Sequence, residues 1–163
     1  MNLRRLKLVH RILTDINDGN YNFVERQHAT NYSPREFDID AWCTHCLSLS
    51  GEVVNMHDNG ETRRACAMGL VAFDNEAIKD GFRHNPLRNV PYFNGNWGWR
   101  AVAEYIRCPK LEAHYFFSKQ FYKKEHVTLD DVVVRIRYQI ALEERRLVRR
   151  IKLLNRFMEW RDK

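Results

Sequence analysis

Residues 128–161 read TLDDVVVRIRYQIALEERRLVRRIKLLNRFMEWR. The segment opens with Thr128, a residue type that caps helix N-termini through its hydroxyl group. Asp130 and Asp131 follow at the positions of a first turn, where negative charge interacts favourably with the helix dipole. Apolar residues then recur every three or four positions, which is the period of an amphipathic α-helix. We therefore predict one long C-terminal helix, around which the rest of the chain is interpreted.

The predicted C-terminal helix carries three stripes of side chains. At about 100° per residue, one apolar set falls within an arc of about 60°, which we call the apolar seam. A basic stripe lies on the opposite side, with a second apolar strip beside it, and Glu143 and Glu144 interrupt the seam for one turn. The apolar seam is Val133, Ile136, Ile140, Leu147, Ile151, Leu154 and Met158; the basic stripe is Arg145, Arg149, Lys152 and Arg156; the second apolar strip is Leu142, Leu153, Phe157 and Trp160.

The predicted helix is too long to fit inside a domain of this size. A helix from residue 129 to residue 161 spans about 50 Å at about 1.5 Å per residue. A compact chain of 163 residues has a radius of gyration near ~15 Å and is only about 40 Å across. We expect a compact helical body over residues 1–127 and a long amphipathic basic helix over residues 128–163, packed on the body or projecting from it at its basic end.

The formal net charge of +6 is concentrated in the last segment of the chain. Residues 135–163 contain ten Lys and Arg against four Asp and Glu, whereas the first 134 residues contain 17 of each sign. A neutral body with a basic end indicates an acidic partner. No apolar run approaches the roughly 18 residues of a membrane span, so we expect no membrane partner.

The rest of the chain is also predicted to be mainly α. Apolar residues recur at helical spacing from Leu3 to Ile16, and Asp18-Gly19 follows as a stop. The segment Ser33-Pro34-Arg35-Glu36 combines a cap, a first-turn proline and a capping-box glutamate, and predicts a second helix that ends near Gly51. Further helices are expected over residues 64–73, 75–79, 99–107 and 110–121, and a short β-hairpin is expected over residues 53–60.

Residues 81–98 contain three glycines, two prolines and four asparagines, which excludes a long regular element. Aromatic residues and arginines alternate in and beside this segment, as on surfaces where bases or peptides stack. An Ω-type loop pinned to the core by its own aromatic rings is the favoured alternative. From this segment we retain Trp97, Trp99 and Arg100 as candidate binding residues.

The cysteines allow two interpretations. Cys43-x-x-Cys46, together with His57 and Cys66, supplies four ligand types that zinc accepts. The spacing of His57 and Cys66 matches no standard zinc finger or ribbon, and the first two cysteines fall on the apolar stripe of the predicted second helix. Cysteine behaves there as a small core hydrophobe. We favour the core interpretation and predict no metal and no cofactor, while the zinc alternative stays open.

No residue pattern predicts catalysis. The sequence contains four cysteines and seven histidines but no nucleophile elbow, phosphate-binding loop or HExxH segment. The pairs Asp38 with Asp40 and Asp130 with Asp131 are explained by their expected places in first helical turns. We therefore predict a non-enzymatic protein with no catalytic residues. The N-terminus lacks the apolar core of a secretory signal, so a cytoplasmic location with reduced cysteines is expected.

Three segments resemble a loose group of small uncharacterised proteins of bacteriophages and their bacterial hosts. The segments are Phe37–Trp42 with an F-D-x-x-x-W pattern, Cys66–Leu70 with a C-x-x-G pattern, and His126–Val132. The chain departs from the pattern by a longer spacer between residues 42 and 66 and by its basic C-terminal extension. The resemblance implies a small helical scaffold and a phage origin, in the cytoplasm of a bacterial host, and it implies no activity.

Together these features predict a macromolecule-binding protein. The resemblance adds the expectation of a host-takeover or defence-inhibiting role, in which the basic C-terminal helix engages nucleic acid or an acidic host protein. Alternatives are a structural or assembly protein that self-associates as a homo-oligomer through this helix, and a small enzyme centred on the cysteines and zinc. Exposed Phe and Trp beside arginines are typical of interface hot spots. The predicted partner-binding residues are Arg145, Arg146, Arg149, Arg150, Lys152, Arg156, Phe157, Trp160, Trp97, Trp99 and Arg100.

Overall fold

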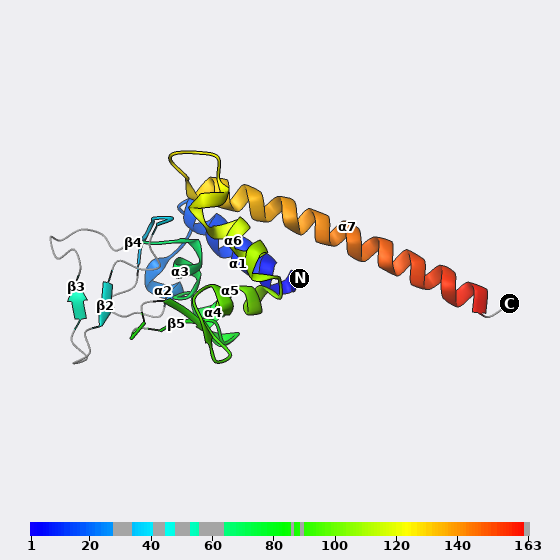
Figure 1. Cartoon of the computed structure of the whole chain (residues 1–163), viewed down its shortest axis with the longest axis horizontal. Helices are drawn as coiled ribbons and strands as arrows, with labels where there is room; N and C mark the ends of the chain where they lie inside the picture. The colour runs from blue at the N-terminus through cyan, green and yellow to red at the C-terminus, as the bar shows by residue number, and fades with distance from the viewer. Residues whose placement is uncertain are drawn as a thin grey trace.

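The computed structural model has a mainly helical fold, as the sequence predicts, in which short strands and several helices form a body and one long helix leaves it (Figure 1). The structure describes residues 1–27, 34–40, 45–47, 53–55, 64–85, 87–88 and 90–161.

Helix α1, Leu3–Asn17, confirms the predicted N-terminal helix. Its N-cap is Asn2, whose side-chain oxygen accepts a hydrogen bond from the backbone N–H of Arg5 at 3.2 Å. One face of α1 is fully buried, as its helical periodicity predicts. The buried residues are Leu6, Val9, Ile12 and Leu13.

The helix predicted from residue 33 to about residue 51 is wrong over its described residues. Strand β1, Glu36–Phe37, pairs in parallel with strand β4, Arg64–Ala65. The Glu36 carboxylate accepts a hydrogen bond from Nε of Arg64 at 3.0 Å, whereas Ser33, the expected cap, lies outside the described residues. The residue that satisfies Glu36 is 28 positions away in the chain. The local cap pattern therefore gives the wrong element because a distant partner determines the backbone conformation.

A second pair of strands is antiparallel. Strand β2, His45–Leu47, faces strand β3, Val53–Asn55, with His45 opposite Asn55. The predicted strand at residues 53–55 is confirmed, but its partner precedes it in the chain and occupies the end of the helix that was expected there. The tight turn expected at residues 58–60 lies outside the described residues.

Three short helices complete the first half of the body: α2, Phe23–Arg26, α3, Ala67–Val71, and α4, Asn75–Lys79. Helix α4 has the predicted bounds. Helix α3 is shorter than the helix predicted over residues 64–73, because Cys66 is extended (φ −65°, ψ 168°) and acts as its N-cap. Every residue of α3 is buried, so this helix lies in the middle of the core.

Within residues 81–98, three short strands form a small antiparallel sheet in place of the expected irregular loop. The strands follow one another in chain order, as in a meander. The β6–β7 turn is made by Asn94 (φ 49°) and Gly95 (φ 84°). Positive φ at both central residues is the requirement of the tight hairpin turn that Asn-Gly favours. The strands are β5, Arg83–Asn85, β6, Val90–Phe93, and β7, Asn96–Trp97.

Two further helices confirm the prediction of a helix pair separated by Pro109. Helix α5, Trp99–Ile106, ends at Arg107, which adopts the left-handed conformation with φ 52°. Helix α6, Lys110–Phe117, is shorter than expected because Ser118 is extended. One turn of 3₁₀-helix, η1, Lys119–Phe121, continues the chain.

Helix α7, Leu129–Arg161, confirms the predicted C-terminal helix. The Thr128 hydroxyl oxygen accepts from the N–H of Asp131 at 3.3 Å, while the Asp131 carboxylate accepts from the Thr128 N–H at 3.0 Å. This reciprocal pair is a capping box with aspartate in the acidic position. Two hydrogen bonds lower the pKa of Asp131 below its ordinary value, the stronger from the Lys124 ammonium and the weaker from the Thr128 N–H. The cap is therefore charged at neutral pH.

Arg135 fixes the start of α7 to the neighbouring α6 segment. Its guanidinium carbon lies 3.5 Å from the ring centroid of Tyr122 and 4.5 Å from that of Tyr115. The same group donates to the carbonyl of Tyr115 and, at 3.1 Å, to the carbonyl of Phe121. The planar guanidinium of an arginine can stack on rings and donate two hydrogen bonds at once, whereas the ammonium of a lysine cannot.

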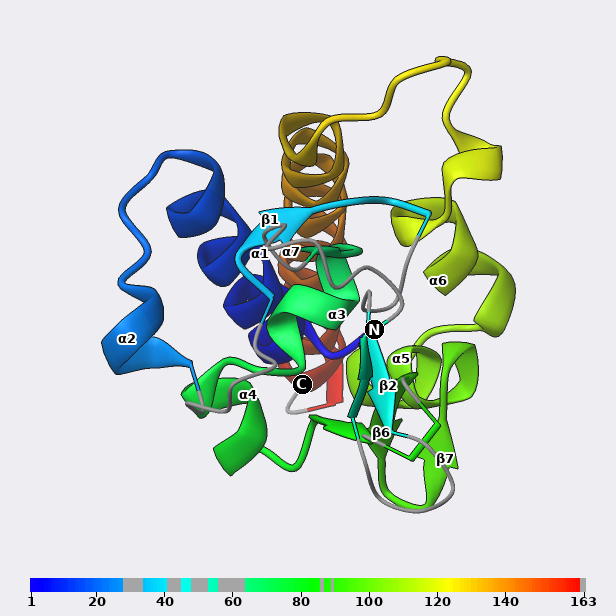
Figure 2. The same ribbon diagram turned by 90° about the vertical axis from the view of Figure 1, so that its left-hand side faces the viewer.

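The core lies where α1, α3, α5, α6 and the first half of α7 meet. Figure 2 looks along α7 and shows α1 on one side of it and α6 on the other. The largest fully buried side chains come from all of these elements. They include Leu6, Ile12, Met68, Tyr105, Phe117 and Ile136, together with Phe82 from the start of the sheet region.

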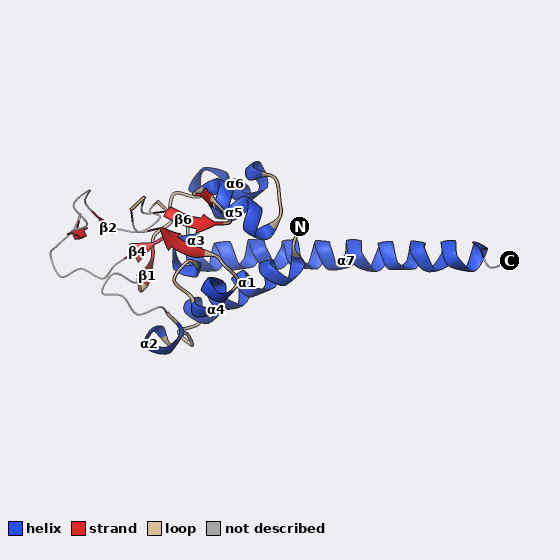
Figure 3. Cartoon of the chain, turned by 90° about the horizontal axis from the view of Figure 1, so that it is seen from below, coloured by secondary structure: helices blue, strands red, loops and turns tan. Residues whose placement is uncertain are grey.

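The second half of α7 extends beyond the body (Figures 1 and 3). In the first half, Val132, Val133 and Ile136 are buried. From residue 145 onward, every described side chain of the helix is exposed. We call residues 145–161 the projecting segment and residues 1–144 the body.

Candidate functional site

The projecting segment displays large apolar side chains to solvent. Eight of them are between 48% and 75% exposed. Exposed apolar patches of this kind are typical of surfaces that bind a partner. These side chains are Leu147, Val148, Ile151, Leu153, Leu154, Phe157, Met158 and Trp160.

The apolar seam is divided by the edge of the body. Its inner part is covered, since Val133 and Ile136 are buried and Ile140 packs against the core. Glu144, at the interruption of the seam, forms an ion pair with Lys7 of α1 at 2.6 Å. Beyond this pair lies the outer seam, which consists of Leu147, Ile151, Leu154 and Met158 and is about half exposed.

The basic side chains of the projecting segment are exposed and mostly uncompensated. Arg146 is paired with Glu143 at 2.6 Å, one turn away on the same helix. Glu143 is held in place by Gln139, whose side-chain amide donates to it at 3.0 Å. Among the described side chains, none forms an ion pair with the basic stripe or with Arg150. The projecting segment therefore presents net positive charge to its surroundings.

The second apolar strip lies beside the basic stripe. Phe157 and Trp160 have ring centroids 6.3 Å apart and lie on neighbouring turns of α7. Leu153 is one turn closer to the body and is 63% exposed. Helical geometry places this strip next to the basic stripe. One face of the projecting segment therefore combines aromatic and cationic groups.

The candidate residues of the body are in a different place. Trp97 is 44% exposed, and the guanidinium carbon of Arg88 lies 4.0 Å from its ring centroid. Trp99 is half-buried and packs against His114, with ring centroids 4.2 Å apart, while Arg100 is exposed. These residues belong to β7 and α5 within the body, and the structure does not bring them together with the projecting segment (Figures 1 and 3).

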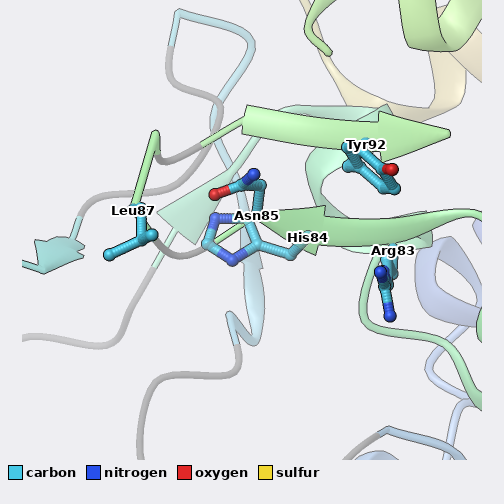
Figure 4. A pocket seen from close by; sticks show the side chains of 5 residues that line it. All are labelled: Arg83, His84, Asn85, Leu87 and Tyr92. Carbon is cyan, nitrogen blue, oxygen red and sulfur yellow. The ribbon is translucent and has the colours of Figure 1, made fainter. Parts of the chain in front are cut away.

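A shallow cavity of about 370 Å³ lies over strands β5 and β6 (Figure 4). Arg83 and Tyr92 face each other across the two strands, with the guanidinium carbon 5.2 Å from the ring centroid. Both belong to the segment of alternating aromatic residues and arginines noted in the sequence, but neither was retained as a candidate. His84, Asn85 and Leu87, which the sequence did not single out, also line the cavity. Pairing of β5 with β6 brings these side chains together. The sequence signal for a sheet here was the Asn94-Gly95 pair, which favours a tight hairpin turn.

A second cavity of about 580 Å³ lies beside the α5–α6 junction and includes Cys108. Burial raises the pKa of this thiol to about 12, so it is protonated at neutral pH and is a weak nucleophile. Glu104 is engaged by the side-chain amides of Asn94, at 2.6 Å, and Asn96. The polar groups here fix the β6–β7 turn against α5, and they form no nucleophile–base pair.

The proposed zinc ligands are only partly described. Cys66 is buried, and its sulfur accepts a hydrogen bond from the N–H of Gly69 at 3.4 Å as the cap of α3. Cys46 lies on strand β2 and not on a helix, whereas Cys43 and His57 lie outside the described residues. Within the described part of the chain, no three His, Cys, Asp or Glu side chains are grouped as metal ligands.

The carboxylate pairs have local structural partners. Asp38 does not lie in a helical turn as expected; its carboxylate accepts from the N–H of Asp40 at 3.0 Å. Asp40 pairs with Lys119 at 2.8 Å, which raises the pKa of that lysine. Asp131 caps α7, with Asp130 beside it in the first turn. Each pair is thus accounted for by turn and cap geometry.

Comparison with known proteins adds no family assignment. No family model matches the sequence, and no curated protein or solved structure matches the chain. Among the described residues, no helix is both long and apolar enough to cross a bilayer. The functional inference therefore depends on the surface of the projecting segment itself.

Proposed function

We propose that this chain is a non-enzymatic macromolecule-binding protein whose projecting segment engages an acidic partner. One observation carries the proposal: exposed aromatic and aliphatic side chains adjoin exposed cationic side chains on an arm that the body does not cover. Aromatic residues and arginines dominate binding energy at protein interfaces. The basic stripe and the second apolar strip together form the proposed binding face.

The aromatic content of this face favours a protein partner. An amphipathic helix binds by laying its apolar residues into a groove, with anchors three or four positions apart. Leu153, Phe157 and Trp160 have this spacing, and the basic stripe beside them suits an acidic rim. Electrostatic complementarity of that kind accelerates association and selects the partner.

Nucleic acid is the second candidate partner. The specific observation in its favour is that the described part of the chain supplies no ion-pair partner for the basic stripe. Phosphate groups would compensate these charges with release of counterions. A role in host takeover or defence inhibition inside a bacterial cell is part of the proposal, and it is supported by the resemblance of Phe37–Trp42 and Cys66–Leu70 to phage proteins.

The test compares two charge variants of equal net charge. In the first, the four residues of the basic stripe are changed to Gln; in the control, four exposed basic residues of the body are changed to Gln. Neither set has an ion-pair partner among the described residues. The control residues are Arg35, Lys79, Lys110 and Lys123.

We expect the stripe variant alone to lose the partner that tagged full-length protein captures from nuclease-treated bacterial lysate. For a nucleic-acid partner, the stripe variant would instead lose affinity for DNA and RNA of every sequence. The logarithmic salt slope would then fall by about 0.7–0.9 for each phosphate contact removed. Equal binding by both variants in both assays would contradict the proposed face.

A further inference from the structure

The apolar seam keeps one spacing across the edge of the body. Ile136, Leu147 and Met158 are 11 residues apart, and Ile140 and Ile151 repeat the interval. An 11-residue repeat corresponds to about 3.67 residues per turn, close to the twist of a straight α-helix. The stripe that packs on the body therefore continues along the projecting segment with a drift of only about 20° per interval.

Helix α1 covers the inner part of this stripe and then ends. Lys7 pairs with Glu144. Figure 1 shows α1 running from the N-terminus back toward the start of α7, so the two helices are antiparallel and the start of α1, at Leu3, lies nearest the outer seam. Figure 1 shows the N-terminus part-way along α7. Past this point, the described residues leave the seam about half exposed.

We infer that the outer seam is a homodimer interface, in which the projecting segments of two copies pack antiparallel and each occupies the position in line with the other copy's α1. The interface continues the established α1–α7 packing with the same stripe and the same helix direction. The proposed binding face is not needed for this pairing, so the inference does not rest on the proposed function.

The position of the body selects the antiparallel arrangement. The body lies on the seam side of α7, because Val133 and Ile136 face its core. A parallel partner in register would bring its own first half of α7 into the space that α1 already fills. An antiparallel partner lies along the outer part of the projecting segment, and its C-terminal end meets the start of α1.

A second copy suits this surface for two reasons. An antiparallel pair has a twofold axis, so one stripe is complementary to itself, with Leu147 opposite Met158 of the second copy and Ile151 opposite Leu154 of the second copy. The helix dipoles also oppose each other favourably. The basic stripe lies about 160° around the helix from the seam, so in the dimer it faces outward and remains accessible.

The first test measures the mass of the full-length protein in solution by light scattering. We expect twice the chain mass of 19.6 kDa. The double variant Ile151→Glu with Leu154→Glu buries two charges at the pairing surface, and it should raise the dimer Kd at least about 100-fold. The matched variant Leu153→Glu with Phe157→Glu makes the same charge change on the second apolar strip and should remain dimeric. Circular dichroism is the control that checks whether both variants keep their helices.

Salt distinguishes this pairing from the binding of an acidic partner. Two copies carry like charge, so raising salt from about 0.1 M to about 1 M, which shortens the Debye length from about 10 Å to about 3 Å, should tighten the dimer. The same increase in salt should weaken the binding of an acidic partner. A monomeric mass at all concentrations and salt levels, or equal loss of the dimer in both double variants, would overturn the inference.

The second test determines direction. Leu147→Cys and Met158→Cys are made separately, mixed, oxidised, and the linked peptides are identified by mass spectrometry. Antiparallel pairing predicts a link between position 147 of one copy and position 158 of the other. Links between two copies of position 147, or a monomer whose seam is covered by a foreign protein, would refute the arrangement.

Discussion

At the scale of single residues, Asp74 has the most demanding environment of the described carboxylates. It is 1% exposed; one oxygen accepts from the N–H groups of Glu76 and Ala77 at 2.8 and 3.3 Å, and the other accepts from the Tyr21 hydroxyl at 2.8 Å. Asp74→Ala removes the cap of α4 and leaves a buried donor unsatisfied, so unfolding free energy should fall by about 3 kcal/mol. Urea denaturation measures this change.

Asp74→Asn is the matched control, because asparagine also caps helices well. Its amide oxygen retains the cap, and its amide nitrogen donates to the Tyr21 hydroxyl in place of accepting from it. We expect this variant to lose clearly less stability than Asp74→Ala. A loss as large as that of the alanine variant would mean that the negative charge beside Arg26, at 3.7 Å, matters more than the cap.

His10 links the α1–α7 contact to pH. Burial, and then the Arg137 charge, lower its pKa below the ordinary value of 6.5, and its Nε2 has no hydrogen-bond partner among the described groups. On acidification, His10 therefore binds a proton more readily in the unfolded chain than in the native chain. Stability is fully present above about pH 6.5 and is lost as pH falls below it.

The melting temperature should accordingly be lower at pH 5.5 than at pH 7.5, with flanking values from about pH 5 to pH 8 defining the curve. His114 has the same sign, because burial, followed by Lys110, lowers its pKa. His10→Leu should flatten the curve in part, and the double variant with His114→Leu should flatten it further. Asp80 and Asp131, whose pKa values lie below 3.8, titrate outside this window. An unchanged curve in both variants would contradict the assignment.

At the scale of elements, the sequence predicts those whose ends are set by their own residues. Thr128 and Asp131 cap each other within one turn, and Pro109 separates α5 from α6, so both features could be located in advance. Glu36 has an equally good local pattern, but Arg64, far along the chain, determines its conformation. The Asn94-Gly95 turn carried a local hairpin signal that the mixed composition around it obscured.

The candidate site likewise has features that the sequence predicts and features that depend on contacts between distant parts of the chain. The three stripes of α7 follow from the helical period alone, so the sequence identified them before any contact was known. Where the seam stops being covered depends on the length and direction of α1, which the structure places antiparallel to α7 over Leu3–Asn17. The cavity over β5 and β6 depends on strand pairing, and helical periodicity carries no information about it.

At the scale of the whole molecule, the proposals assign two tasks to one helix, core packing and binding. Its first half completes the core, and Arg135 anchors it between the rings of Tyr115 and Tyr122. This anchoring gives the second half a fixed direction without packing of its own. A rigid arm lowers the entropy cost of binding, since fewer conformations are lost when a partner or a second copy is engaged.

The division predicts how the chain responds to truncation. A chain ending at Glu144 keeps Val133, Ile136 and Ile140 in the body, and every described side chain that it removes is exposed. Its cooperative melting should persist, with stability within about 0.5 kcal/mol of the full chain, while partner capture and dimerisation are lost. A chain ending at Arg135 removes Ile136 from the core and should fail to melt cooperatively, because a large buried residue contributes about 2–5 kcal/mol. If the chain ending at Glu144 also fails to melt cooperatively, the outer half of α7 stabilises the body. The basic stripe would then be an ordinary solvated face of a structural helix.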